Sequence, residues 1–214
     1  EPHCTLIQSN TDGLIVKLNS LDDYELIDDI CWEWEQMTGV KLAFDPIIKK
    51  IFQKDVNNYV AVMENGKVHC KGAYVKELND LDYDLPIVNE AVKNYIVYGY
   101  RVEDTIFACR ELRKFQKIVK LSHKYEWVEH EHGHRHSKFD NKAYRTFASR
   151  DNSDGRLMAC RMTSKGLERK KFGGTADKCF ILNDDLNGVP IPRKLDYGWY
   201  ISLARKRLED FGIC

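Results

Sequence analysis

The chain has 214 residues, of which 43% are hydrophobic, and its 33 basic and 33 acidic residues leave no net charge. This length allows one large domain or two small ones, and no apolar run approaches the ~20 residues that a membrane-spanning helix needs. The seven cysteines contain no Cys-x-x-Cys pair, which argues against a zinc ribbon or a dithiol redox site and favours reduced intracellular thiols.

The chain starts with two apolar segments, residues 6–9 and 14–17, on either side of Asn10-Thr11-Asp12-Gly13. Asn, Asp and Gly suit the positive φ angles of short hairpin loops, so the pattern predicts a β-hairpin with Asp12 at its tip. A carboxylate held at a rigid tip is well placed to bind a metal ion. The same residues also serve an ordinary turn, so a purely structural role stays open.

A helix is predicted next, from Ser20 as its N-cap to about Met37. Residues 40–44 predict a short strand that closes against the first hairpin, and residues 46–54 predict a connection. The apolar stripe of the helix, expected to face the core, consists of Tyr24, Ile27, Cys31 and Trp34.

A second hairpin is predicted from residues 58–63 and 67–72, because Asn65-Gly66 between them is a strong signal for a tight turn. The acidic stretch of Asp80, Asp82 and Asp84 then leads to Pro86, a residue suited to the first turn of a helix. This change in composition predicts a domain boundary between residues 85 and 86.

The second half predicts helices first and short strands afterwards. Helix patterns cover residues 87–98, 103–119 and about 196–211, and strand patterns cover residues 144–149, 157–162 and 179–182. A small sheet with a helix, followed by mixed helices and short strands, predicts an α+β fold.

Charge is unevenly distributed along the chain. Residues 1–100 carry a net charge of −8 and residues 101–214 a net charge of +8. This asymmetry suits an acidic, metal-holding part joined to a basic part that contacts phosphates, although solvated loops carry such charges too. The basic stripe of the second half comprises Arg161, Lys165, Arg169, Lys170, Lys171 and Lys178.

Residues 130–136 contain four histidines at a spacing of two. In a strand, this spacing places all four on one face, where Ni²⁺ or Zn²⁺ could bind. The spacing differs from the i, i+4 pair of a helical zinc site, and no cysteine lies close by in sequence. We therefore favour a mobile loop over a metal site.

Two segments of the first half resemble the palm of family B DNA polymerases of the phage type. Asn10–Gly13 resembles the metal-binding turn Tyr-Gly-Asp-Thr-Asp-Ser, in which Asp12 matches the second Asp, while Asn10 and Gly13 replace the first Asp and the Ser. Residues 56–59 with Lys71-Gly72 resemble the Lys-Lys-Arg-Tyr strand and the Lys-Gly that follows it, with Val-Asn-Asn in place of the basic trio.

The second half resembles the thumb of the same family, over residues 104–125 and 199–208. The resemblance therefore implies the C-terminal part of a palm over residues 1–85 and a thumb over residues 86–214. It implies a DNA-directed DNA polymerase that uses two Mg²⁺ ions, with Asp12 as catalytic metal ligand, and a cytoplasmic location in a bacterial host or phage-infected cell. Primer–template DNA and deoxynucleoside triphosphates are the implied partners, without a membrane.

The positions implied to contact DNA are Lys54, Asn57, Asn58, Tyr59, Lys71, Arg161, Lys165, Arg169, Lys170 and Lys171. Asparagine side chains can donate to the acceptors that base pairs present in the minor groove, but the charge must come from lysine and arginine. Basic residues on the thumb are expected to contact the phosphates of the duplex.

Two elements of the family do not occur in this sequence. One is the upstream Asp-x-x-Ser-Leu-Tyr-Pro element with the partner Asp, and the other is the fingers helix with a nucleotide-binding Lys. We therefore expect a piece of a longer polymerase that is inactive alone. The alternatives are a non-catalytic DNA-binding module with a structural Asp12, and a metal-dependent phosphodiesterase that combines Asp12 with Asp22 or Asp45.

Overall fold

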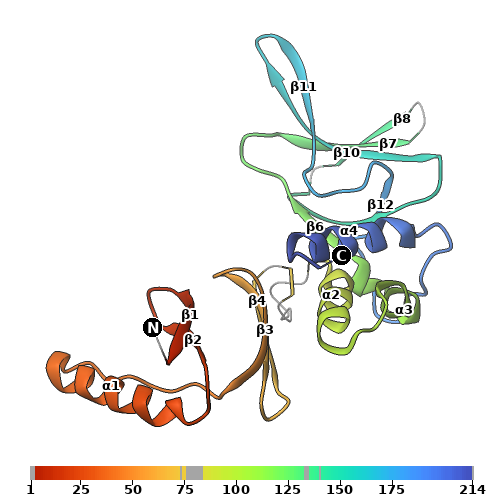
Figure 1. The fold of residues 1–214 in the computed structure, drawn as a ribbon. Helices are drawn as coiled ribbons and strands as arrows, with labels where there is room; N and C mark the ends of the chain where they lie inside the picture. Colours follow the sequence, from red (N-terminus) through yellow and green to blue (C-terminus); the bar gives the residue numbers. More distant parts are fainter. Residues whose placement is uncertain (1–2, 73, 76–83, 133–134, 140, 214) are drawn as a thin grey trace. The chain divides into compact units, whose positions relative to one another are not determined.

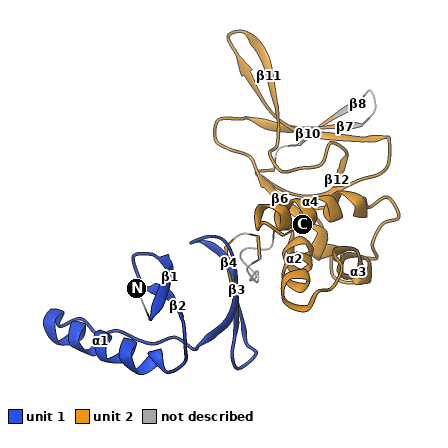
Figure 2. Cartoon of the chain, in the orientation of Figure 1, with its two compact units in different colours: residues 1–69 blue, residues 70–214 orange. Residues whose placement is uncertain are grey.

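A computed structural model describes residues 3–72, 74–75, 84–132, 135–139 and 141–213. It has an α+β fold, and the described residues contain four α-helices and several small antiparallel sheets (Figure 1). The chain divides into two compact units, Glu1–His69 and Cys70–Cys214 (Figure 2). The palm–thumb boundary at residues 85 and 86 stays a prediction, and Asp80 and Asp82 of the acidic stretch lie outside the described residues.

The first unit begins with the predicted hairpin, which the structure confirms. Strand β1 (Cys4–Ser9) pairs with β2 (Leu14–Leu18) in antiparallel register. The predicted helix is also present, but α1 spans Asp23–Thr38 with Asp22 as its N-cap, so it begins two residues later than expected. Residues 20–22 form a turn instead, in which the Ser20 backbone N–H donates to Asp23 Oδ2 at 2.9 Å.

The strand predicted at residues 40–44 is absent, although the segment is described. The Glu35 carboxylate holds this segment against the end of α1, because Glu35 Oε1 accepts from the Leu42 N–H at 2.6 Å and Glu35 Oε2 from Lys41 Nζ at 2.8 Å. The predicted connection at residues 46–54 contains a strand instead. The sheet has the order β3-β4-β5, with strands β3 (Ile48–Asp55), β4 (Asn58–Met63) and β5 (Val68–Lys71). The predicted second hairpin is therefore confirmed.

The first unit buries little apolar surface. Helix α1 has no buried residue, and of its predicted core stripe Tyr24 is 37% and Trp34 39% exposed. The expectation that this stripe faces a core is therefore wrong for the described residues, because Phe44 packs beside Tyr24, with ring centroids 5.7 Å apart, but leaves every residue of the stripe unburied. Val60 and Ala61 of β4 are fully buried.

The second unit starts with a group of helices. The prediction of α2 (Pro86–Tyr98) is confirmed, whereas the helix predicted at residues 103–119 is wrong. Helix α3 covers only Val102–Ala108, a 3₁₀ turn follows at Leu112–Phe115, and Lys117–Lys120 forms strand β6. Leu112 and Phe115 of the 3₁₀ turn are both buried. Their apolar side chains continue the helical spacing of α3, which is why the sequence pattern predicted one longer helix.

Two antiparallel sheets complete the second unit, and the three strands predicted there are confirmed. One sheet has the order β12-β9-β6 and the other β11-β10-β7-β8. Val119, Tyr144 and Cys179 of the first sheet share a buried cluster with Val128 and Leu157 of the second. The strands are β7 (Trp127–His132), β8 (Arg135–Phe139), β9 (Ala143–Ala148), β10 (Asp154–Thr163), β11 (Gly166–Lys171) and β12 (Cys179–Ile181).

The C-terminal helix α4 (Tyr197–Asp210) confirms the prediction for the end of the chain. Asp196 caps it by accepting from the Trp199 N–H at 3.3 Å. The buried Tyr200 hydroxyl joins this helix to the 3₁₀ turn and to β9. It donates to the Phe115 carbonyl oxygen at 2.8 Å and accepts from the Ala148 N–H at 3.0 Å. No helix among the described residues is long and apolar enough to cross a bilayer.

Candidate functional site

Asp12 lies at the tip of the β1–β2 hairpin, and its side chain is exposed. Asn10 builds the turn around it. Asn10 Oδ1 accepts from the backbone N–H groups of Asp12 at 2.8 Å and Gly13 at 2.9 Å, and the Asn10 N–H donates to the Gly13 carbonyl oxygen at 3.0 Å. The Asp12 carboxylate does not take part in these bonds, so it is open to a ligand.

Asn10 therefore has a clear structural role at the position where the resembling motif has its first Asp. Its side-chain oxygen satisfies two backbone donors of a turn, as Asx turns do. A neutral amide performs this task without placing a second negative charge beside Asp12. The turn thus fixes the backbone of Asp12 while supplying no second carboxylate.

Gln8 links the Asp12 hairpin to the turn between β3 and β4. Its side chain is 4% exposed, and Gln8 Nε2 donates to the Val56 carbonyl oxygen at 3.4 Å. Gln8 Oε1 is buried, and the described residues offer it no hydrogen-bond partner. This contact brings together the two segments that resemble the polymerase palm, a juxtaposition that neither hairpin pattern alone predicts.

The turn at residues 55–58 is organised by Asp55, a residue that the sequence analysis missed. The Asp55 carboxylate accepts from the Asn57 N–H at 2.9 Å, from Asn58 Nδ2 at 2.9 and 3.1 Å, and from Lys54 Nζ at 3.0 Å. Hydrogen bonds from Asn58 and then Lys54 lower its pKa to about 2. The spacing Asp-x-Asn at residues 55–57 is typical of an Asx turn and could have predicted this role of Asp55 from the sequence.

These bonds change what the predicted DNA contacts of the first unit can do. The Asn58 amide and the Lys54 ammonium both face Asp55, so part of their donor capacity is already used. The exposed Asn57 side chain lies at the turn itself. Tyr59 packs beside His69, with ring centroids 5.8 Å apart, and Lys71 ends strand β5.

The predicted basic stripe of the second unit is divided between two faces. In the β10–β11 register, Arg161 is opposite Glu168 and Arg169 is opposite Cys160, so Arg161 and Lys170 point to one face and Arg169 to the other. Three cations of this group form ion pairs: Arg161 with Glu168 at 2.6 Å, Arg169 with Glu129 at 2.7 Å, and Lys171 with Asp177 at 2.7 Å.

Lys165 and Lys170 are both exposed. Lys165 lies in the turn of this hairpin and Lys170 lies on β11. Ion pairing also changes the pKa of an acidic partner. The hydrogen bond from Arg161 lowers the pKa of Glu168. The remaining residue of the stripe, Lys178, donates to Asn152 Oδ1 at 2.5 Å.

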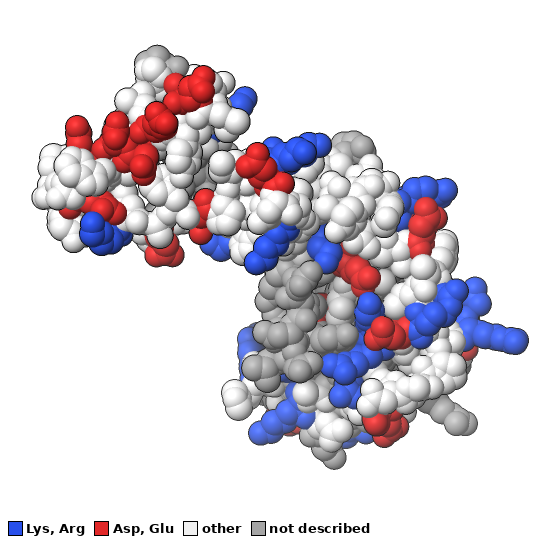
Figure 3. Space-filling model, turned by 90° about the horizontal axis from the view of Figure 1, so that it is seen from below, with Lys and Arg blue, Asp and Glu red and all other residues white. Residues whose placement is uncertain are grey.

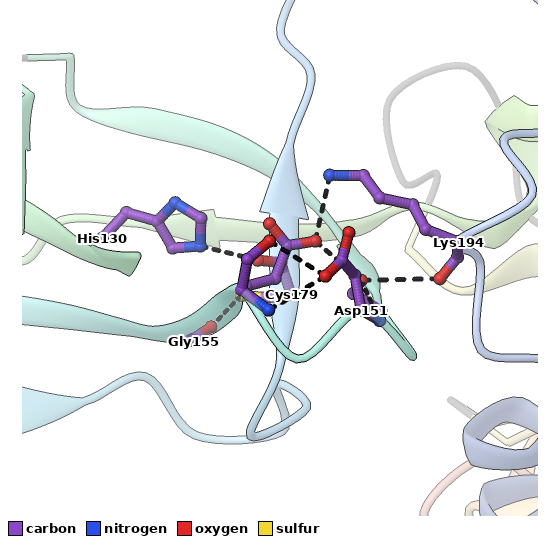
Figure 4. Close-up of polar contacts among 8 residues, drawn as sticks. His130, Asp151, Gly155, Cys179 and Lys194 are labelled. Atoms are coloured by element: carbon purple, nitrogen blue, oxygen red, sulfur yellow. Dashed lines mark hydrogen bonds and ion pairs between the residues drawn. The ribbon is translucent and has the colours of Figure 1, made fainter. Parts of the chain in front are cut away.

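The histidine segment is not the expected loop over its described residues, because residues 127–132 and 135–139 form the β7–β8 hairpin. His130 is 2% exposed, and its Nε2 lies 2.6 Å from the Cys179 carbonyl oxygen (Figure 4). Its ring is therefore used inside the fold, and His134 lies outside the described residues. No group of three His, Cys, Asp or Glu side chains that could hold a metal occurs among the described residues.

Two buried thiols of these sheets, Cys179 and Cys160, are poor candidates for nucleophiles. Burial is the main cause that raises the pKa of Cys179 to about 12 and that of Cys160 to about 11. Cys179 Sγ donates weakly to the Gly155 carbonyl oxygen at 3.5 Å (Figure 4).

An ion pair between a half-buried lysine and a buried carboxylate lies close to these residues, and the sequence analysis also missed it. Lys194 Nζ lies 2.9 Å from Asp154 Oδ2, and the Ser149 hydroxyl donates to the same oxygen at 2.6 Å (Figure 4). The Asp154 side chain is only 2% exposed. Buried charges of this kind are paired for stability, so we assign this cluster to the architecture of the second unit.

Charge on the surface follows the division of the sequence. Acidic side chains gather over α1, whose residues include six acids and no base, whereas lysine and arginine side chains are frequent over the second unit (Figure 3). The acidic and basic residues that are separated along the sequence are therefore also separated on the surface.

Comparison with models of protein families finds no match, and comparison with curated proteins finds none either.

Proposed function

We propose that this chain is the C-terminal palm and thumb part of a DNA-directed DNA polymerase of the phage type in family B. One observation supports the proposal above the others. The exposed Asp12 carboxylate lies on a turn that Asn10 fixes, in a hairpin that Gln8 links to the Asp55-Val56-Asn57-Asn58 turn. Both turns are the segments that resemble the palm.

In this proposal Asp12 is one ligand of a magnesium site. Two Mg²⁺ ions at such a site neutralise the charge on a nucleotide triphosphate and lower the pKa of the primer 3′-hydroxyl. Mg²⁺ in proteins is held by one or two carboxylates together with substrate phosphates, so a single exposed carboxylate fits part of a site. The second carboxylate and the nucleotide-binding Lys come from segments outside this sequence.

The remaining predicted residues contact the primer–template duplex. Asn57 and Tyr59 belong to the β3–β4 hairpin, whose turn bonds to Gln8 of the Asp12 hairpin, with Lys54 paired to Asp55 at that β3–β4 turn and Lys71 at the end of β5. Basic residues of the β10–β11 hairpin contact phosphates. Such a protein acts in the cytoplasm of a bacterial host or phage-infected cell.

The test is primer extension by a longer protein that contains this chain, compared with its Asp12→Ala variant. We expect extension to fall by more than about 100-fold, since even an outer-shell partner of a metal costs 10–100-fold when removed. Asp22→Asn is the matched control, because Asp22 is an exposed acid in the turn before α1 and accepts from the Ser20 hydroxyl at 3.3 Å. Undiminished extension by the Asp12→Ala variant contradicts the proposal.

A non-catalytic DNA-binding module is the second candidate, and it is favoured by the exposed Lys165 and Lys170 of the β10–β11 hairpin, which can contact phosphates without a metal. In that case Asp12 serves only the turn. The longer protein then binds duplex DNA without extending a primer, and Asp12→Ala leaves the dissociation constant for DNA unchanged.

A further inference from the structure

The β10–β11 hairpin extends beyond the sheet to which it belongs. Strand β7 pairs with β10 only as far as Cys160, opposite Trp127, whereas β10 and β11 stay paired with each other out to Thr163 and Gly166. The end of this hairpin is therefore a two-stranded ribbon, seen as the projecting arm labelled β11 in Figure 1.

The end of the ribbon is held in one conformation by its own polar groups. The Thr163 hydroxyl donates to the Gly166 carbonyl oxygen at 2.8 Å and accepts from the Lys165 N–H at 3.2 Å. Gly166 has a φ of 106°, which a residue with a Cβ adopts only with strain. A ribbon end that is fixed in this way loses little conformational entropy on binding.

Two large apolar side chains are exposed at this end. Met162 and Leu167 are directly opposite each other in the register, so their side chains share one face, and they are 58% and 40% exposed. Neither is required by the turn, whose bonds involve Thr163, Lys165 and Gly166. An exposed apolar pair on a fixed projection is a feature of a contact surface.

The charge around this pair identifies the partner. Residues 161–171 contain five basic residues, of which Arg161, Arg169 and Lys171 pair with acids, whereas Lys165 and Lys170 are exposed. Lys165 lies in the turn between Met162 and Leu167, whereas the exposed Lys170 lies farther down the ribbon and points to its other face. An exposed lysine beside an apolar pair suits a polyanion such as duplex DNA, whose apolar base faces become accessible beside the phosphates when a base step is unstacked.

We propose that this ribbon enters the minor groove of duplex DNA and inserts Met162 and Leu167 between two base pairs, with Lys165 of the turn on a flanking phosphate. The proposal rests on the proposed function to the extent that both require binding to DNA. Apolar side chains that enter the minor groove unstack a base step and bend the duplex, and the bound protein gains phosphate contacts in return. The β10–β11 hairpin then grips the duplex by shape as well as by charge.

The test uses the 214-residue chain and two fluorescent duplexes of about 25 base pairs, one fully paired and one with a central two-base mismatch. Because the mismatch lowers the cost of unstacking, we expect the chain to bind the mismatched duplex on the order of tenfold more tightly. We expect the Met162→Gln/Leu167→Gln variant to bind both duplexes equally. The matched control is the swap Met162→Leu/Leu167→Met, which keeps an apolar pair and so keeps the preference.

Energy transfer between dyes at the two duplex ends gives a second measurement. The chain is expected to raise transfer by bending the duplex, and the double Gln variant is expected to lose this rise. Circular dichroism checks the fold of that variant, and the single Met162→Gln variant, changed only at the more exposed position, replaces it if it fails to fold.

The outcomes separate the two proposals. Binding without a mismatch preference, or a preference that survives in the Gln variants, overturns the insertion of Met162 and Leu167 and leaves the polymerase assignment intact. If the Gln variants instead abolish self-association in sedimentation experiments without changing DNA binding, the apolar pair is a protein contact and the inference is wrong. No binding of the chain to any duplex overturns both.

Discussion

Lys194 Nζ lies 2.9 Å from Asp154 Oδ2, but the two partners differ in exposure, with 38% of the Lys194 side chain and 2% of the Asp154 side chain accessible. This asymmetry predicts unequal effects of removing either partner. Lys194→Met leaves a buried carboxylate without its cation, and we expect it to lower the free energy of unfolding by about 3 kcal/mol. Asp154→Asn costs less, because Lys194 can turn toward water.

Urea unfolding of both variants measures this difference, with Lys178→Met as the control. Lys178 is exposed and bonds to the side chain of Asn152, so its removal leaves no buried charge. Equal destabilisation by Lys194→Met and Asp154→Asn contradicts the argument from exposure.

Tyr200→Phe is predicted to destabilise the second unit by about 1–3 kcal/mol, since it leaves the buried Phe115 carbonyl and Ala148 N–H without their partner. Tyr98→Phe is the matched control, because Tyr98 is 57% exposed. Denaturant unfolding followed by fluorescence compares the two. A Tyr200→Phe variant as stable as the control shows that water satisfies both backbone groups.

The pKa of Asp55 gives a prediction for acid pH. Its folded-state pKa of about 2 lies below the ordinary value of 3.8, so its hydrogen bonds stabilise the turn above pH 3.8 and are lost as the pH falls through 2. NMR titration of the Asp55 carboxyl carbon should give a midpoint near 2, and Asn58→Ala should raise it, because the Asn58 hydrogen bond is the largest cause of the shift. A midpoint near 3.8 in the unmodified chain contradicts the turn geometry.

The neutralisation of Arg169, Lys170 and Lys171 to Ala is predicted to weaken duplex binding and to flatten its salt dependence. Ion pairing predicts that the individual cations contribute unequally to DNA binding. Lys165→Gln/Lys170→Gln should lower the salt slope by about 2, one for each phosphate that the variant no longer neutralises. Arg169→Gln/Lys171→Gln removes the same charge but acts on residues paired with Glu129 and Asp177, so its effect should be smaller.

Dissociation constants measured by anisotropy over a range of roughly 50 to 300 mM salt distinguish the two double variants. An unchanged slope in both counts against the thumb assignment, and equal slopes show that the ion pairs open when DNA binds.

The local elements that sequence patterns predicted correctly depend on contacts between near neighbours. Asn10, Asp12 and Gly13 produce the first hairpin, and Asn65-Gly66 produces the second, because turn residues act on their own backbone. The helix expected at residues 103–119 was wrong for the opposite reason. Lys117–Lys120 pairs with Ala143–Thr146, and no local pattern records a partner more than twenty residues away.

By itself, the sequence determined the two hairpins, the helices near each end of the second unit, the division of charge and the exposed position of Asp12. Only the tertiary structure decided the link from Gln8 to Val56, the burial of His130, the Asp154–Lys194 pair and the division of the basic stripe between two faces. The first set depends on turn chemistry and side-chain period, which act over a few residues. The second depends on which distant strands lie side by side, and long-range pairing is set by the packing of the whole unit.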